Sequence, residues 1–375
     1  MLEIIYNYDI ISNMETVFVG MSGGVDSSVA ATLLLEQGYN VVGVYMKNWS
    51  RDLPGMKCPW AENLADAKRV AVRLGIDFLV WDFEKEYREK VVEYMLSEFR
   101  AGNTPNPDIM CNQEIKFKLF YEKAMEAGAD FIATGHYARV GRGATSLAKN
   151  DADLGSASLL RAVDENKDQT YFLYRISEGA LSHTLFPIGG MMKPDVKKLA
   201  AEKGLHNAYK KESMGVCFVG EVGMKDFLKE YIDIRPGEIR EVESGKVLGY
   251  HEGAIFYTIG QRHGLYLDGE KGVVNDGLPY YVVKKDTGQN ILYVSKNINN
   301  EMLWTKELQL RDIFLRREIA PEAQLMVRLR HRAPLIPAAF DGKTLQFELE
   351  IKRPAAGQSA VFYDGEICLG GGIIK

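Results

Sequence analysis

A seven-residue turn, Ser22-Gly-Gly-Val-Asp-Ser-Ser28, constrains the fold of this chain more than any other stretch. It follows a β-branched and aromatic apolar run at 16–21 and precedes good helix formers at 29–36. The order strand, glycine-rich turn, helix directs free backbone N–H groups and a helix N-terminus at one point, an arrangement that binds phosphate. The sequence therefore predicts an anion-binding loop within an α/β domain.

The residue types in this turn indicate which class of phosphate-binding loop it belongs to. Gly23 and Gly24 let the backbone approach phosphate oxygens, Ser22 and Ser27 add hydroxyl donors, and a carboxylate at Asp26 suits a bound Mg²⁺. The turn has no lysine, so it is neither the phosphate loop of kinases nor the GxGxxG of dinucleotide folds. It resembles the SGGxDS loop of the ATP pyrophosphatases, which implies cleavage of ATP to AMP and pyrophosphate. The structural alternative is a serine- and glycine-rich connection.

Strand-like and helical segments alternate as far as residue 135, which predicts a doubly wound parallel sheet. Ligands of such sheets lie at the carboxyl ends of strands, so we expect the loop, Met46 and Gly135 to share one cleft. Further along, glycine and proline recur between short strand-like runs, which predicts a small, mostly β central domain. Regular alternation of apolar and polar residues then predicts a C-terminal β-barrel. The expected domains are 1–217, 218–294 and 295–375. The expected elements are strands at 16–21, 39–46, 77–83 and 130–135, and helices at 29–36, 61–74, 84–100, 116–127 and 194–203.

Charge and composition exclude several classes of protein. With 375 residues and a net charge of −5, the chain has no global basic field, so a nucleic-acid partner must meet a local patch. No apolar run approaches the ~20 residues that span a bilayer, and the N-terminal dozen residues do not read as a signal peptide. The four cysteines form no CxxC pair, which gives zinc little support and suits a reducing cytoplasm.

A stiff polar stretch, Asn103-Thr-Pro-Asn-Pro-Asp108-Ile-Met-Cys111-Asn112, is the second unusual feature. Its two prolines force the residues before them out of the α region, so the segment is expected to be extended. Cys111 is expected just before a helix that begins near Asn112, whose dipole would lower the pKa of the thiol. The alternative is a proline-rich connector with an inert cysteine.

A second thiol lies in Met214-Gly-Val-Cys217-Phe-Val-Gly220. Taken alone, it favours a buried cysteine in a strand. If the fold brings Cys217 to Cys111, one thiol can carry sulfur and the other can attack it. Cys58 and Cys368 lack such a setting and are assigned structural roles.

The C-terminal region contains Arg328-Leu-Arg330-His331-Arg332, predicted as a strand. The two-residue strand period would then put three guanidinium groups on one face. Such a row suits a phosphate backbone, and a solvated barrel face is the alternative.

Eight motifs in order across the chain resemble the tRNA-specific 2-thiouridylases. They are SGGVDSS at 22–28, NPDIMCN at 106–112, ATGHYAR at 133–139, KDQTYFL at 167–173, FPIGG at 186–190, GVCF at 215–218, FYTIGQRHGL at 256–265 and GQSAVFY at 357–363. The chain departs from the family in its N-terminal dozen residues and in a longer 141–158 loop.

This resemblance implies ATP-dependent 2-thiolation of the wobble uridine of a tRNA. Asp108 would remove the ring proton of the flipped-out base as its C2 oxygen is adenylated, Cys217 would carry persulfide sulfur, and Cys111 would attack the persulfide. ATP, with Mg²⁺, would lie on Gly20, Met21, Ser22, Gly23, Gly24, Val25, Asp26 and Ser27, with Met46 and Gly135 near the adenosine. The tRNA would contact Asn106, Pro107, Asp108, His136, Lys167, Asp168, Gln169, Arg330, His331 and Gln358.

The resemblance also implies a persulfide-donor protein as partner, and a monomer acting on one tRNA is the simplest expectation. Two other functions stay open. One is a synthetase of the same superfamily that adenylates a small carboxylate or ureide, which would need neither Cys111 nor Cys217. The other is a non-catalytic, ATP-gated RNA-binding module, which would release no pyrophosphate from ATP and tRNA.

Overall fold

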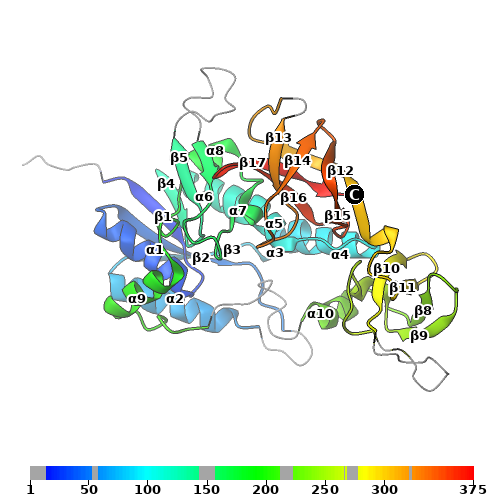
Figure 1. Cartoon of the computed structure of the whole chain (residues 1–375). Coiled ribbons are helices and arrows are strands. Elements are labelled where there is room, and N and C mark those ends of the chain that lie inside the picture. The colour runs from blue at the N-terminus through cyan, green and yellow to red at the C-terminus, as the bar shows by residue number, and fades with distance from the viewer. Residues whose placement is uncertain are drawn as a thin grey trace, which may run out of the picture.

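The chain forms an α/β domain, a small β domain and a barrel (Figure 1). The computed structural model describes residues 14–52, 58–142, 157–211, 223–265, 267, 278–320 and 323–375. In the described part of the chain, no helix is both long enough and apolar enough to cross a membrane.

The first domain is built on a parallel sheet with β1 at its centre. The strand order is β3-β2-β1-β4-β7, and every neighbouring pair is parallel. Its strands are β1 (Thr16–Gly20), β2 (Asn40–Lys47), β3 (Asp77–Asp82), β4 (Phe131–Thr134) and β7 (Thr184–Leu185). The continuous apolar run of β1 is explained by burial on both faces, as parallel sheets require.

Helices cover both faces of this sheet, which confirms the predicted doubly wound architecture. Val17 and Val19 of β1 pack into one core, while Phe18 between them packs into the other. Helices on the Val17 side are α1 (Val25–Glu36), α2 (Trp60–Leu74) and α9 (Lys193–Glu202). The Phe18 side holds α3 (Glu84–Tyr87), η1 (Arg88–Val92), α4 (Glu93–Arg100), α5 (Pro107–Met110), η2 (Cys111–Leu119), α6 (Phe120–Glu126), α7 (Thr170–Leu173) and α8 (Glu178–Ser182).

One predicted helix begins earlier than expected. The helix expected over 116–127 starts at Pro107 and continues through the π-helical turn η2 into α6. Proline at the first helical position needs no N–H partner and has its φ already set for a helix, so it starts this one. Asn106 before it is extended, with φ −115° and ψ 94°. The stiff stretch is therefore extended only up to Asn106, and the expectation for the rest of it was wrong.

The central domain is small and mostly β, as predicted. It comprises α10 (Met224–Tyr231), β8 (Gly237–Glu241), β9 (Val247–His251), η4 (Ala254–Phe256), β10 (Tyr281–Asp286) and β11 (Ile291–Ser295). The strand order is β10-β11-β8-β9 around a core that includes Ile239, Val282 and Leu292.

The C-terminal domain is a six-stranded barrel that closes where β12 pairs with β17. Its elements are η6 (Glu301–Leu303), β12 (Trp304–Leu315), β13 (Gln324–Arg328), β14 (Ile336–Phe340), β15 (Thr344–Lys352), β16 (Ser359–Asp364) and β17 (Ile367–Ile374). The hairpin of β5 (Arg139–Arg142) and β6 (Ala157–Leu160) pairs with β17, so a segment of the N-terminal region extends the barrel sheet.

Candidate functional site

The predicted phosphate loop is a tight turn between β1 and α1, held by its own hydroxyl groups. Ser27 Oγ donates to the Gly24 carbonyl at 3.1 Å and accepts from the Ser22 backbone N–H at 3.2 Å. Gly23 has φ +78°, and a Cβ there would lie 2.3 Å from the Asn63 carbonyl oxygen. Only glycine fits this position, because the backbone of α2 packs directly against the turn and restricts its conformation.

The structure brings Met46 and Gly135 to this loop. A Cβ at Gly20 would lie 2.9 Å from Met46 Cε, and a Cβ at Gly135 would lie 2.5 Å from the Ser27 backbone nitrogen. Both approaches follow from the parallel pairing of β1 with β2 and β4, whose carboxyl ends meet at one edge. This juxtaposition of the three strand ends was predicted from the sequence.

Asp26 has two partners that the sequence analysis missed. Lys193, the first residue of α9, donates to both carboxylate oxygens at 2.7 and 2.8 Å, and Tyr137 donates its hydroxyl at 3.0 Å. The loop thus obtains a lysine from 167 residues further along the chain. The absence of lysine from the turn itself gave no sign of this ammonium group.

A Mg²⁺ ion fits this position if Lys193 releases one carboxylate oxygen. The Asp26 side chain is 28% exposed at the start of α1, beside the hydroxyl groups of the loop. Mg²⁺ in nucleotide sites takes one or two carboxylates, with phosphates and waters as its other ligands. Asp26 is therefore the residue that could hold the metal.

Residues just before the segment with Cys217 are anchored behind the loop. Asn207 donates to the Gly23 carbonyl at 3.0 Å, and Lys210 donates to Asp66 at 2.6 Å. Burial of Asp66 opposes ionisation, yet hydrogen bonds from Lys210 and His206 hold the pKa of its carboxyl below the usual value. Cys217 itself lies outside the described residues, so its predicted approach to Cys111 stays a prediction.

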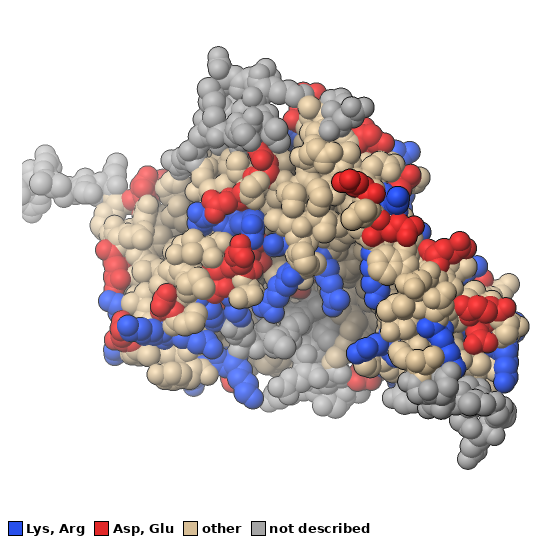
Figure 2. Space-filling model, in the orientation of Figure 1, with Lys and Arg blue, Asp and Glu red and all other residues tan. Residues whose placement is uncertain are grey.

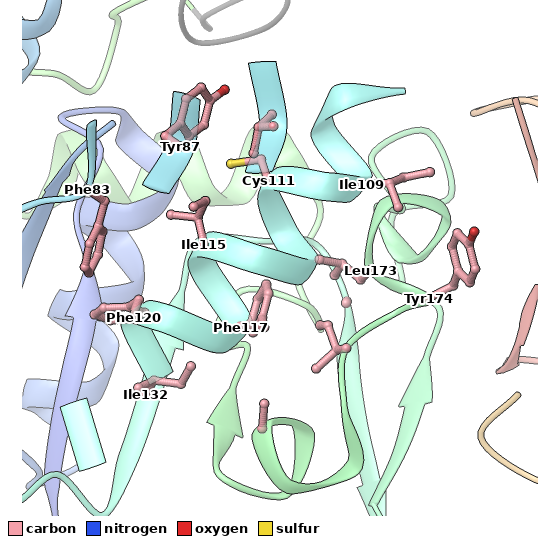
Figure 3. Packing of buried hydrophobic residues seen from close by; sticks show 14 of the residues in the cluster. Phe83, Tyr87, Ile109, Cys111, Ile115, Phe117, Phe120, Ile132, Leu173 and Tyr174 are labelled. Carbon is pink, nitrogen blue, oxygen red and sulfur yellow. The ribbon is translucent and has the colours of Figure 1, made fainter. Parts of the chain in front are cut away.

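Cys111 lies inside a continuous helix. Because that helix begins at Pro107, Cys111 stands in its second turn, and the predicted lowering of its pKa by a helix N-terminus at Asn112 was wrong. The side chain is 3% exposed and belongs to the core on the Phe18 side of the sheet. Figure 3 shows its sulfur on the side of Tyr87, among the apolar residues of this core.

Asp108, three residues earlier, is partly buried. Burial raises the pKa of its carboxyl, and the charge of Lys116 partly offsets that rise. Lys116 also lies 3.4 Å from Nε2 of His136, whose Nδ1 is 2.8 Å from the Thr134 hydroxyl. Burial and Lys116 together hold the pKa of His136 well below its usual value, so the ring is neutral.

The predicted tRNA-contacting residues 167–169 divide into different environments. Asp168 is 1% exposed, and its carboxylate accepts from the Thr170 hydroxyl at 2.9 Å and from Arg328 at 2.8 Å. Gln169 accepts from the Tyr137 backbone N–H at 2.8 Å, which fixes it near the nucleotide loop. Asp168 can therefore serve a tRNA site by holding Arg328 and the turn around it in place.

The predicted row of three guanidinium groups was wrong. The strand β13 ends at Arg328, which is buried against Asp168 and lies over the Tyr363 ring at 5.4 Å. Arg330 and Arg332 are exposed in the turn that follows, where Arg332 has φ +63°. The two-residue period cannot continue through this turn, so the three side chains do not share a face.

His331 links this turn to the α/β domain. Its ring centroid lies 4.5 Å from that of Phe172 in α7, and burial together with Arg332 lowers its pKa to about 4. Gln358, from the loop before β16, donates to the Thr104 carbonyl at 2.7 Å. The barrel therefore contacts both the KDQTYFL segment and the stretch that leads to Asn106.

One face of the molecule has a hollow. Figure 2 shows lysine and arginine side chains around a depression that lies below the barrel, between the α/β domain and the central domain. A local basic surface is what an acidic protein needs to meet a nucleic acid.

The two remaining described cysteines fit structural roles. Cys368 in β17 is fully buried, and burial raises the pKa of its thiol to about 12. Cys58 is also buried, with its sulfur 3.6 Å from the Trp49 carbonyl oxygen.

Comparisons with known proteins cover nearly the whole chain. Three family models match, described as a tRNA methyl transferase HUP domain over 15–221, a tRNA methyl transferase PRC-barrel domain over 225–296 and an aminomethyltransferase beta-barrel domain over 305–374. A "4-thiouridine synthetase - RNA complex with bound ATP" matches over 58% of this chain and 50% of that one, at 18% identity. Its TM-score of 0.36 is too low to carry an argument.

Two curated relatives are far more similar. "tRNA-specific 2-thiouridylase MnmA 2" of Geobacillus kaustophilus (strain HTA426) is 46% identical over 365 residues, covering 96% of this chain and 94% of the relative. "tRNA-specific 2-thiouridylase MnmA" of Idiomarina loihiensis (strain ATCC BAA-735 / DSM 15497 / L2-TR) is 46% identical over 369 residues, covering 96% of each chain. The chain belongs to the tRNA-specific 2-thiouridylase family.

Proposed function

We propose that this protein uses ATP to replace the C2 oxygen of the wobble uridine of tRNA with sulfur. One observation carries the proposal beyond family membership. Gly135 packs on the backbone of the phosphate loop, and the next residue, His136, contacts Lys116, whose charge acts on Asp108. These links support a shared site for the predicted nucleotide cradle and the predicted base-binding segment.

The first step is adenylation of the base. ATP would lie on residues 20–27 with Met46 and Gly135 near its adenosine, and Mg²⁺ held by Asp26 would neutralise charge on the phosphates. The uracil C2 oxygen attacks the α-phosphorus as the bond to pyrophosphate breaks, and Asp108 takes the ring N3 proton. A carboxyl whose pKa burial raises is a stronger base than an exposed aspartate, which suits this role.

Sulfur transfer follows at the activated carbon. Cys217 carries a persulfide received from a donor protein, and the Cys111 thiolate attacks its inner sulfur. A Cys111–Cys217 disulfide forms and hydrosulfide leaves. Hydrosulfide adds to C2, AMP departs, and a thiol reductant restores the two cysteines. Because Cys111 is buried, we infer that tRNA binding moves it into contact with the persulfide.

The tRNA meets residues from two domains in this proposal. Asn106, Pro107 and Asp108 hold the extruded uridine, because the C2 oxygen cannot be reached in a stacked base. The other contacts come from His136, Lys167, Gln169, Arg330, His331 and Gln358, with Asp168 as a support. A monomer acting in the cytoplasm with one tRNA is the simplest assembly.

Mass analysis of tRNA tests the function. Wild-type protein, ATP, Mg²⁺, tRNA and a persulfide source should replace one oxygen with sulfur on the wobble uridine, with release of AMP and pyrophosphate. The Cys217→Ser variant should release pyrophosphate but leave the tRNA without sulfur. Unchanged tRNA with a competent donor would reject the proposal, and release of pyrophosphate with a small carboxylate in place of tRNA would favour a synthetase.

A further inference from the structure

Lys116 stands between the two halves of the candidate site, although no motif singled it out. It lies in η2, and its ammonium is 3.4 Å from Nε2 of His136. His136 directly follows Gly135, whose backbone packs on Ser27 of the phosphate loop. Lys116 is therefore linked to the nucleotide cradle through His136 and Gly135.

The charge of Lys116 also acts on Asp108. The Lys116 charge opposes the effect of burial on the pKa of the Asp108 carboxyl. Lys116 acts on the Asp108 carboxyl through its charge, and no hydrogen bond joins these two described residues. Lys116 is the charged group that acts on Asp108, and the same ammonium contacts His136, which follows β4.

The local backbone is unusual at this point. η2 is a π-helix whose regular geometry breaks at Phe117, with φ −109° and ψ 16°. Wide turns of this kind are rare and recur at functional sites, because they redirect a side chain without ending a helix. Here the wide turn begins at Cys111 and carries Lys116 toward His136.

His136 fixes the direction in which Lys116 donates. Because an ammonium can only donate, Nε2 accepts one Lys116 hydrogen, and a neutral ring then carries its proton on Nδ1, where it can donate to the Thr134 hydroxyl. A lysine has two further hydrogens to donate. These remain for an anion between the phosphate loop and Asp108.

We propose that Lys116 is a catalytic residue of the adenylation step, where it binds the α-phosphate of ATP. The inference rests on the proposed function and deepens it. As the bond from the uracil oxygen to phosphorus forms and the bond to pyrophosphate breaks, Lys116 keeps its proton and stabilises the charge on the equatorial oxygens. The N3 proton goes to Asp108. A fixed donor at developing charge contributes roughly 10²- to 10³-fold in rate.

Single-turnover release of pyrophosphate, with saturating tRNA and ATP, tests this role. Lys116→Met should slow the chemical step about 100-fold or more, while ATP affinity, measured separately, changes less than about threefold. Lys116→Arg should restore part of the rate, because it keeps the charge. Lys118→Met is the matched control: Lys118 lies two residues along the same helix, is about half exposed and pairs with Glu114. It should stay within about twofold of wild type.

A pH profile separates catalysis from support of the fold. Loss of the Lys116 charge should raise the pKa of Asp108 further, so the acidic limb of the Lys116→Met profile, where Asp108 loses its proton and becomes active as a base, should move to higher pH. A purely structural lysine would lower the melting temperature without moving that limb.

The possible failures can be told apart. Wild-type protein that thiolates tRNA, beside a Lys116→Met variant of normal single-turnover rate, overturns the role of Lys116 alone. A variant whose whole deficit is in ATP or tRNA affinity also overturns it. Wild-type protein that releases no pyrophosphate with tRNA overturns the proposed function itself.

Discussion

Two carboxylate–lysine pairs, one at each half of the site, are arranged in opposite ways. At the phosphate loop, Lys193 donates to both oxygens of Asp26, and the pair is joined directly. On the base side, Asp108 and Lys116 act on each other through charge, and burial raises the pKa of the Asp108 carboxyl. A carboxylate that is hydrogen-bonded to a cation stabilises the local structure. A carboxylate whose pKa is raised by burial can accept a proton more readily. The comparison assigns binding to the first pair and chemistry to the second.

The largest effect is expected at Asp108. Asp108→Asn should lower the rate of thiolation about 10²- to 10⁴-fold, because an amide cannot take the N3 proton. Single-turnover thiolation measures this, and Asp108→Glu serves as the variant that keeps a base. Activity of Asp108→Asn within about tenfold of wild type would contradict the role of Asp108 as base.

The same variant should be more stable at neutral pH. A carboxyl whose folded pKa lies above its unfolded pKa stabilises the fold most below the unfolded value, and this contribution is lost as pH rises through the folded value. Asp108→Asn has no carboxylate to ionise at this position, so its melting temperature should exceed that of wild type at pH 8. Near pH 3, where the wild-type carboxyl is protonated, the two melting temperatures should be closer. Asp26→Asn should show the opposite sign, because it breaks a formed ion pair. A melting temperature for Asp108→Asn below that of wild type at pH 8 would contradict this difference between the two carboxylates.

Cys111→Ser tests a step that the nucleotide loop does not perform. Repeated thiolation should fall by at least about 100-fold, because serine cannot resolve a persulfide, while pyrophosphate release with tRNA persists. Cys58→Ser, another buried cysteine, is the control and should keep both activities. Alkylation of Cys111 should also be slow in free protein and faster with tRNA. A Cys111→Ser variant with normal turnover would leave Cys111 as a core residue.

Lys193→Met sharpens the assignment of the first pair. Without the ammonium, the Asp26 charge faces the triphosphate directly, so ATP should bind about tenfold more weakly at low Mg²⁺, with a smaller deficit at high Mg²⁺. Lys193→Arg should retain most of the affinity. ATP titrations at several Mg²⁺ concentrations measure the effect. Unchanged affinity at every Mg²⁺ concentration would mean that Lys193 only holds α9 in place.

The first pair also shows where sequence reasoning stops. The phosphate loop, Met46 and Gly135 were predictable because parallel strands align their carboxyl ends, a rule that needs only element order. Lys193 was not, because its contact with Asp26 depends on how α9 packs beside α1. The proline at the second position of α9 predicted the start of this helix but not the residues against which the helix packs.

On the base side the errors came from a local rule applied too far. Two prolines correctly predicted extended backbone up to Asn106, yet Pro107 also starts a helix, which moved Cys111 away from the helix N-terminus. In the barrel, the two-residue period was extended past Arg328 into a turn, and the buried Asp168–Arg328 pair was not foreseen. A short-range pattern shows where an element begins and cannot show what lies across the fold from it.

The smallest expected effect concerns the barrel turn that was predicted as a strand. Arg330 is exposed there, so Arg330→Ala should weaken tRNA binding about threefold. The slope of log affinity against log salt concentration should fall by about 1, the value expected for the loss of one phosphate contact. Because the pKa of neighbouring His331 is about 4, tRNA affinity should not change through titration of that ring between pH 6 and 8. The control is Lys343→Ala, at the β14–β15 turn, which lies at the opposite end of these strands. Binding measured at several salt concentrations decides the outcome: equal salt slopes for Arg330→Ala and wild type would remove this turn from the tRNA-contacting surface. The base-side pair and its chemistry would then depend on the α/β domain alone.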